Sequence, residues 1–151
     1  MSKVDITTIQ DYYGVVFPQE YLDFQQTNSG SSFNLMESGE VTDWQIRFSE
    51  LDDQFITNNI QVVNDVNPDP KRIIPIAWSV SSGNNYLLDY RKHSACPVVL
   101  LMEHEEAMVR EDAESETDTP EEAQQLMEEN VRVIADSFAS FLAKLRAYQA
   151  L

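Results

Sequence analysis

The residues best suited to chemistry in this sequence are a histidine set among carboxylates and a lone cysteine. His104 stands in the run Glu103-His104-Glu105-Glu106, and imidazole together with carboxylates can bind a divalent metal. The run lacks the helical spacing of a zinc protease motif and has no cysteine partner, so a solvated strand end is the simpler interpretation. We therefore expect neither a metal site nor a cofactor.

Cys96 is the second candidate, because a cysteine beside a base can act as a nucleophile. His93 is close in sequence, but a nucleophilic cysteine needs an electropositive setting and this chain is acidic. Its position before Pro97, at the start of an apolar run, predicts a packed core thiol instead. A single cysteine forms no internal disulfide, and no apolar run is long enough to span a membrane. The sequence thus predicts a cytoplasmic protein without catalytic residues, not an enzyme.

Three further motifs are expected to be turns rather than ligand sites. The run 64–69 superficially resembles a calcium loop, but it lacks the required glycine and the terminal glutamate. Ser82-Gly83-Asn84 fits a hairpin turn, since no Lys-Ser/Thr follows to make a phosphate cradle. Lys71-Arg72 and Arg91-Lys92-His93 are too small, against a net charge of -16, to bind nucleic acid, so solvated turns are predicted there.

The negative charge is concentrated in residues 103–129, which hold twelve Asp or Glu against one base, Arg110. This segment carries eleven of the sixteen net negative charges. Such a field repels nucleic acid phosphates and anionic lipids and attracts basic partners. Residues 111–118 contain too little apolar area to fold alone, so we expect a mobile acidic loop over about 105–119.

Two short helices are predicted to open the fold that positions these residues. Apolar residues recur at helical spacing from Ile6 to Tyr13, and Gly14 then offers a left-handed stop. A second helix is expected over 18–26, with Pro18 at its first position, where no amide hydrogen is needed. Asn28-Ser29-Gly30 ends it.

The next stretch predicts a strand that runs into a capped helix. Residues 43–48 alternate strictly, which is typical of a half-buried strand whose polar face carries Asp43, Gln45 and Arg47. Ser49 followed by Asp52 resembles a capping box. It predicts a helix over 50–59.

The middle of the sequence predicts the sheet. Apolar residues alternate from Ile74 to Val80, and residues 86–90 return after the turn, which indicates a hairpin. Residues 97–102 are continuously apolar, so they are expected to form a central strand covered on both faces. The sheet should be mainly antiparallel.

The last third of the sequence leaves two interpretations open. Thr119-Pro120-Glu121-Glu122 is a strong helix start, with a hydroxyl cap and a proline first. From Met127 to Tyr148 the apolar spacing allows one long amphipathic helix. The β-branched residues at 131–134 and a possible cap at Asp136-Ser137 favour a break there. The predicted fold is therefore α+β: a single domain over 1–151, with a mainly antiparallel central sheet, two N-terminal helices and a C-terminal amphipathic helix packed on the sheet.

Five segments in order resemble the SUKH superfamily, and together they span nearly the whole chain. They are an opening helix pair with a Gly-x-x-x-Pro junction, a strand entering a helix, a Gly-containing hairpin, a Pro-Val strand ending in acid-His, and a closing helix. Their sequences are "ITTIQDYYGVVFPQEYLDFQQTNSG", "WQIRFSELDD", "IIPIAWSVSSGNNYLLDY", "CPVVLLMEHE" and "VIADSFASFLAKL".

The resemblance implies a binding function. Bacterial members of the superfamily are typically immunity proteins that neutralise a cognate toxin domain, often a nuclease, whereas eukaryotic relatives act as regulatory interaction domains. A nuclease must be basic to hold nucleic acid, so an acidic inhibitor could occupy its basic surface. The resemblance also places the hairpin end beside the following strand end, which makes the candidate contact residues Asp89, Glu103, His104, Glu105 and Glu106.

Two alternatives stay open on the sequence alone. One is a general interaction or regulatory domain whose partner is no toxin. The other is an enzyme or metal-dependent protein that uses Glu103 and His104.

Overall fold

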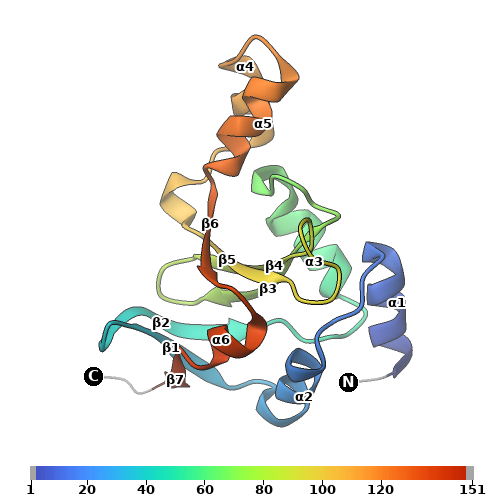
Figure 1. The fold of residues 1–151 in the computed structure, drawn as a ribbon, viewed down its shortest axis with the longest axis vertical. Helices are drawn as coiled ribbons and strands as arrows, with labels where there is room; N and C mark the ends of the chain where they lie inside the picture. The colour runs from blue at the N-terminus through green and yellow to red at the C-terminus, as the bar shows by residue number, and fades with distance from the viewer. Residues whose placement is uncertain (1–2, 149–151) are drawn as a thin grey trace.

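Seven strands form one antiparallel sheet in the order β6-β5-β4-β3-β2-β1-β7 in the computed structural model, which describes residues 3–148 (Figure 1). Every neighbouring pair is antiparallel, as the sequence predicts. The strands are β1 (Ser32–Glu37), β2 (Glu40–Phe48), β3 (Ile73–Ser79), β4 (Asn85–Asp89), β5 (Val98–Met102), β6 (Val131–Ala135) and β7 (Leu145–Ala147).

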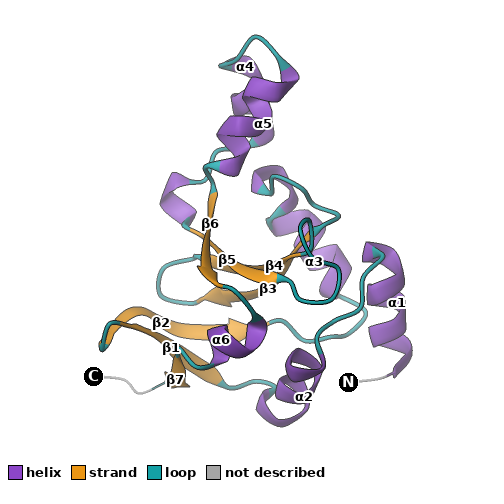
Figure 2. Ribbon diagram, viewed as in Figure 1, coloured by secondary structure: helices purple, strands orange, loops and turns teal. Residues whose placement is uncertain are grey.

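Helices surround this sheet, which confirms the α+β class (Figure 2). The α-helices in residues 3–148 are α1 (Lys3–Tyr13), α2 (Gln19–Asn28), α3 (Phe55–Val62), α4 (Arg110–Ser115), α5 (Pro120–Glu128) and α6 (Phe138–Leu142). Two short 3-10 helices, η1 (Asn64–Val66) and η2 (His104–Glu106), connect the others to the sheet.

The sheet is strongly curved, and its connectivity requires this. The outer strands β6 and β7 would lie about 29 Å apart in a flat sheet, since neighbouring strands are about 4.8 Å apart. The connecting residues 136–144 reach at most about 25 Å, because five of them are helical in α6. The sheet therefore bends around α6, whose Phe138 and Phe141 are buried.

The main core fills the concave side of this sheet. α1, α2, α3 and α6 all contribute to it, and aromatic rings dominate. Phe141 of α6 lies 5.5 Å from the ring of Tyr86 and 6.3 Å from that of Phe48, between centroids. The largest fully buried side chains include Tyr21, Tyr86, Tyr90, Phe55 and Phe141.

Two smaller apolar clusters lie outside the main core. One joins the opposite face of β3, β4 and β5 to η1, through Val63, Ile73, Leu87, Leu100 and Met102. The other joins α4 to α5 and contains only small or flexible side chains, Ala113, Ala123 and Met127.

The N-terminal helices occur as the sequence predicts, with one shift. Gly14 ends α1 with φ +66°, a left-handed conformation that favours glycine. Pro18 is the residue before α2 rather than its first helical residue, and its carbonyl accepts hydrogen bonds from the amides of Tyr21 and Leu22. Such one-residue differences are usual at helix ends.

The expectation that Asp43 faces water is wrong. The ladder between β1 and β2 is irregular at this point, and Gln45 has φ +56°, so strict alternation is interrupted. An irregularity of this kind re-aims side chains along a strand. As a result Asp43 is buried while the apolar Ile46 and Phe48 keep their predicted burial.

The predicted capped helix over 50–59 is also wrong at its start. α3 begins at Phe55, and Ser49 does not cap it: its amide donates to the Ile76 carbonyl, so Ser49 still belongs to the sheet. Asp52 instead forms a turn, in which Oδ1 accepts from the amide of Gln54. Local turn chemistry therefore delays the helix.

The hairpin and the central strand are confirmed. β3 and β4 pair around the turn containing Gly83, whose φ is +79°, and β5 lies between β4 and β6. The expectation for Cys96 is wrong, because this residue is exposed. β5 begins only at Val98, so Cys96 lies in the preceding loop while Pro97 is the first buried residue.

The predicted acidic loop over 105–119 is largely helical. η2 occupies 104–106 and α4 occupies 110–115, and α4 packs on α5 through Ala113. The helix start at Thr119 is confirmed, since its Oγ1 accepts from the amide of Glu122 at 3.2 Å.

The predicted break near Asp136 is confirmed, so the long-helix alternative does not apply. The β-branched stretch forms β6, in keeping with the preference of such residues for strands. Ser137 caps α6 by accepting from the amide of Ser140 at 3.0 Å. The C-terminal helix is short, and β7 follows it.

Candidate functional site

The structure separates the predicted contact residues into two places. Glu103, His104, Glu105 and Glu106 follow β5 directly, at the end where Met102 pairs with Asn85. Asp89 pairs with Val98 at the other end of the same two strands. About 13 Å of strand therefore lies between the two groups, and the expected adjacency of Asp89 to Glu103 is wrong. It fails because antiparallel pairing puts the end of β4 beside the beginning of β5.

Asp89 is 7% exposed and is bound to a neighbouring arginine. Its Oδ2 lies 3.0 Å from Nη2 of Arg91, and Nη1 of Arg91 lies 2.6 Å from Oε2 of Glu128 in α5. The hydrogen bonds that Arg91 donates to Asp89 are the main cause that raises the pKa of Arg91. Arg91 is therefore not simply solvated, as the sequence suggested, but joins the end of β4 to α5.

His104 is held at the other end by the hairpin turn. Its backbone amide donates to Oδ1 of Asn84 at 2.9 Å. Gly83 lies so close that a Cβ there would approach the His104 ring at 3.3 Å. The turn thus fixes the beginning of η2 and the carboxylates that follow it.

Asp43 stabilises the same hairpin turn through hydrogen bonds. Its carboxylate accepts hydrogen bonds from Ser79 Oγ at 2.7 Å, Ser82 Oγ at 3.2 Å and Tyr86 Oη at 2.6 Å. Burial, followed by the hydrogen bond and charge of Asp43, raises the pKa of Tyr86. A fully satisfied buried network of this kind rigidifies its surroundings. It fixes both β2 and the turn that positions His104.

The acidic segment forms a projecting helical hairpin, α4–α5, which stands away from the sheet (Figure 1). Its carboxylates face solvent on both helices, whereas its interior holds only the small apolar cluster described above. Exposed acids in α4–α5 and the turn between them are Glu111, Asp112, Glu114, Glu116, Asp118, Glu121 and Glu122.

Polar side chains attach this hairpin to the body of the protein. Asn130 donates to the carbonyls of Val66 and Met108, and its Oδ1 accepts from the Met108 amide at 2.8 Å. Arg110 and Gln124 both donate to the carbonyl of Pro68, at 3.0 and 2.9 Å. The base of the hairpin is therefore fixed beside η1.

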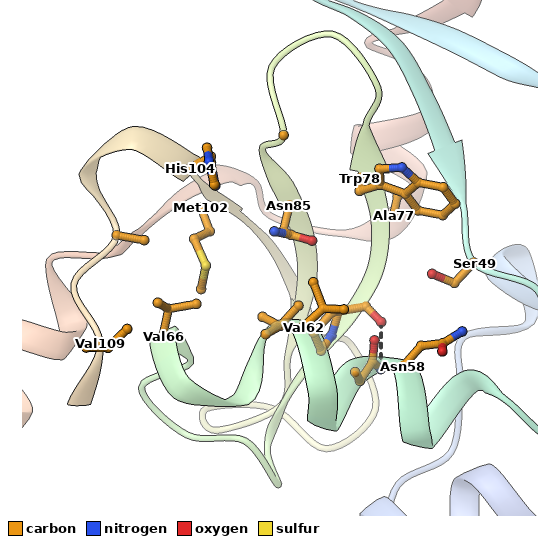
Figure 3. Close-up of a pocket in the computed structure, with 15 residues that line it drawn as sticks. Ser49, Asn58, Val62, Val66, Ala77, Trp78, Asn85, Met102, His104 and Val109 are labelled. Carbon is orange, nitrogen blue, oxygen red and sulfur yellow. Dashed lines mark hydrogen bonds between the residues drawn. The ribbon is translucent and has the colours of Figure 1, made fainter. Parts of the chain in front are cut away.

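An apolar groove of about 680 Å³ lies between η1, α3 and the sheet, next to the base of the hairpin. Figure 3 shows Met102, Asn85 and Trp78 along the sheet, facing Val62 and Val66. Asn59, inside the groove, donates to the Pro75 carbonyl at 3.2 Å and thereby ties α3 to β3. The remaining lining residues are Ser49, Asn58, Val63, Ala77, Gly83, His104, Ala107 and Val109.

Sequence reasoning missed this groove. Trp78 was counted among the buried alternating residues of its strand, yet its side chain is 40% exposed. Val62 lies beyond the predicted end of its helix and is 73% exposed. The available signal was the presence of two apolar residues, Val62 and Trp78, on either side of the start of β3 in sequence. Only the fold brings them to the same groove.

No group of three or more His, Cys, Asp or Glu within residues 3–148 is arranged to hold a metal ion. No helix in that range is long and apolar enough to cross a membrane. The described structure thus presents an acidic helical hairpin and an apolar groove at its surface.

Comparison with known protein families identifies a match. The model of the SMI1 / KNR4 family (SUKH-1) matches residues 1–144, which includes the hairpin, the groove and every predicted contact residue. No curated protein and no solved structure matches the chain.

Proposed function

The chain belongs to the SMI1 / KNR4 family (SUKH-1), and on that premise we propose that it is an immunity protein that binds a basic toxin domain and neutralises it by forming a complex. The observation that carries the proposal is the family match over residues 1–144. The mechanism requires no bond to be made or broken by this protein. Its place of action would be the cytoplasm, where a nuclease toxin meets nucleic acid.

The projecting hairpin supports a basic partner. Seven exposed carboxylates on α4, α5 and their turn form a surface of one sign, and the whole chain has a net charge of -16. Complementary charge can raise an association rate towards about 10⁸ to 10⁹ M⁻¹s⁻¹ at low salt. Rapid capture is useful to a cell that must inactivate a toxin before it acts.

Glu103, His104, Glu105 and Glu106 remain our proposed contact residues. They lie between the hairpin and the groove, and η2 exposes the side chains of His104, Glu105 and Glu106. Oε1 of Glu103 lies 3.9 Å from Nη2 of Arg132. This ion pair is exposed to solvent and therefore holds Glu103 only weakly. Asp89 also stays a proposed contact, but a partner would have to reach it through its pair with Arg91.

Co-expression tests the proposal directly. The chain would be produced together with the C-terminal domain of the polypeptide encoded beside its gene, and growth and co-purification would be measured. We expect this chain to restore growth and to co-purify with that domain at a fixed ratio. A catalytically inactivated toxin domain, which does not affect growth, is the control for expression. If the chain neither restores growth nor co-purifies with the domain, the proposal is contradicted, and a partner that is no toxin is favoured.

A further inference from the structure

The groove has exposed apolar side chains on two of its walls. Val62 is 73% exposed and Trp78 is 40% exposed, on opposite sides of a volume of about 680 Å³. A cavity of this size is within the range of binding pockets in proteins. Aromatic residues in such positions are often the residues that contribute most to an interface.

We propose that this groove binds an apolar side chain of the partner that is flanked in sequence by Lys or Arg. The inference rests on the proposed function and deepens it, because it assigns the residue chemistry that the neutralised domain must present. The occupant is a loop or extended segment of a basic protein.

Charge complementarity identifies this occupant. Among the described residues, no Lys, Arg, Asp or Glu lines the groove, and the one titratable side chain in its lining is that of His104. Residues 102–109 nevertheless supply four lining residues, and the exposed Glu105 and Glu106 stand between them in sequence, with the acidic α4 following. The groove thus has an uncharged lining next to exposed negative charge, which complements an apolar side chain between basic ones.

Two side-chain amides in the groove can form hydrogen bonds with the backbone of such a segment. Asn58 on α3 and Asn85 on β4 both line the groove, and within residues 3–148 neither side chain has a hydrogen-bond partner. An amide group can donate and accept at once, as a peptide backbone requires. Figure 3 shows the two side chains on different walls, with Asn58 on the helix and Asn85 on the strand.

The two surfaces would then divide the work of binding. Exposed carboxylates act over about 8 Å at physiological salt and mainly accelerate encounter. A buried apolar contact mainly slows dissociation, which is where most differences in affinity arise. Substitutions in the groove should therefore change the dissociation rate, whereas those in the hairpin should change the association rate.

The experiment uses two labelled peptides that differ only at the central residue, KRSFSRK and KRSSSRK, and fluorescence polarisation at physiological salt. We expect the full-length wild-type protein to bind the Phe peptide at least tenfold more tightly than the Ser peptide. Val62→Glu should weaken binding of the Phe peptide at least tenfold, even though the added negative charge favours a basic peptide. Val16→Glu is the matched control, since Val16 is 71% exposed and lies outside the groove. It should leave the affinity unchanged or slightly higher.

A second pair of variants tests the other wall. Trp78→Ala should weaken the Phe peptide at least tenfold, whereas Tyr148→Ala, at a residue 37% exposed and outside the groove, should not. Circular dichroism of each variant checks that it is folded. Equal binding of the two peptides, or equal effects of Val62→Glu and Val16→Glu, would overturn the proposal.

The growth test keeps this inference separate from the proposed function. If groove variants lose the Phe peptide but the neighbouring domain is not neutralised by wild-type protein, the groove stands and the toxin assignment fails. If growth is rescued and Val62→Glu rescues as well as wild type while binding both peptides equally, the groove proposal fails and the immunity function stands.

Discussion

The concave core and the α4–α5 hairpin are built on opposite physical plans. The core packs tyrosine and phenylalanine rings from four helices and several strands, many of them fully buried. The hairpin has a thin interior of Ala113, Ala123 and Met127 under a surface of carboxylates. Apolar burial stabilises at about 25 cal/mol per Å², so most of the folding free energy must come from the core. The hairpin, residues 110–128, holds eight acids against Arg110 and so carries seven of the sixteen net negative charges.

This difference separates stability from recognition. A projecting surface held by few apolar contacts can change its charges without affecting the core. The groove lies at the junction of the two regions, where α3 and η1 meet the base of the hairpin. Substitutions in each region should therefore give distinct effects, and the following predictions test that separation.

The largest loss of stability is expected from Phe141→Ala. This side chain is fully buried and packs against Phe48, Tyr86 and Phe138, so its removal leaves a cavity at the centre of the curved sheet. We expect the free energy of unfolding to fall by about 4 kcal/mol, measured by urea denaturation. Val133→Ala, at an exposed position on β6, should change it by less than about 0.5 kcal/mol. Equal effects would show that the core does not dominate stability.

Asp43→Ala should cost somewhat less, about 3 kcal/mol, because it leaves the buried hydroxyl of Tyr86 without its acceptor and removes one of the two acceptors of Ser79. Asp43→Asn keeps the size of the side chain and one carbonyl oxygen, so its loss should be smaller. Urea denaturation of both variants checks the order. A loss confined to the alanine variant would mean that volume matters more than the hydrogen bonds.

Met127→Ala should cost about 2 kcal/mol, but mainly within the hairpin. Amide hydrogen exchange should show faster exchange in α4 and α5, while the protection of β3, β4 and β5 is retained. Uniformly faster exchange across the sheet would contradict the separation of the two regions.

High pH should destabilise the core while affecting the hairpin little. Burial raises the pKa of Tyr13, Tyr21, Tyr86 and Tyr90, so the unfolded chain releases these protons first as the pH rises. Stability from these groups is complete below about pH 10 and declines above it, because the unfolded state then binds fewer protons. When the pH rises from 9 to 11, the free energy of unfolding of the Tyr86→Phe variant should fall by about 1 kcal/mol less than that of the wild type. Identical pH profiles of the two proteins would contradict this assignment.

The smallest effect on stability is expected from neutralising four hairpin acids together, by the substitutions Glu111→Gln, Asp112→Asn, Glu114→Gln and Glu116→Gln. The free energy of unfolding should change by less than about 1 kcal/mol, since exposed charges contribute little to stability. The association rate with the toxin domain should instead fall about tenfold at low salt, with a shallower dependence on salt. Stopped-flow measurements over a range of salt check this, and an unchanged rate and slope would contradict steering by the hairpin.

Periodic patterns predicted the elements that carry the main core. The helix ending at Gly14, the hairpin around Gly83 and the apolar strand β5 each have enough apolar residues in register to be recognised locally. α4 lacks such a pattern, because its one fully buried side chain is Ala113 and its packing depends on α5. A composition typical of disorder therefore concealed a helix.

The remaining errors concern features that depend on distant parts of the chain. Asp43 is buried because hydroxyls from β3 and β4, more than thirty residues away, surround it. The groove requires α3, the sheet and residues 102–109 together, and no local pattern reports their meeting. The expected adjacency of Asp89 to Glu103 is a different error, because the predicted antiparallel sheet already implies that the end of β4 lies beside the beginning of β5.

The pairing of β7 with β1 has a consequence for the order of folding. Phe33 of β1 lies opposite Ala147 of β7, so two strands that are far apart in sequence pair with each other. Contacts this distant in sequence are slow to form, because the intervening chain must first be brought together. During synthesis, one edge of β1 stays unpaired until β7 has been made, because β7 pairs with that edge. Phe138 and Phe141 of α6 then fill the concave side of the sheet. The main core should therefore close only after α6 and β7 have been synthesised.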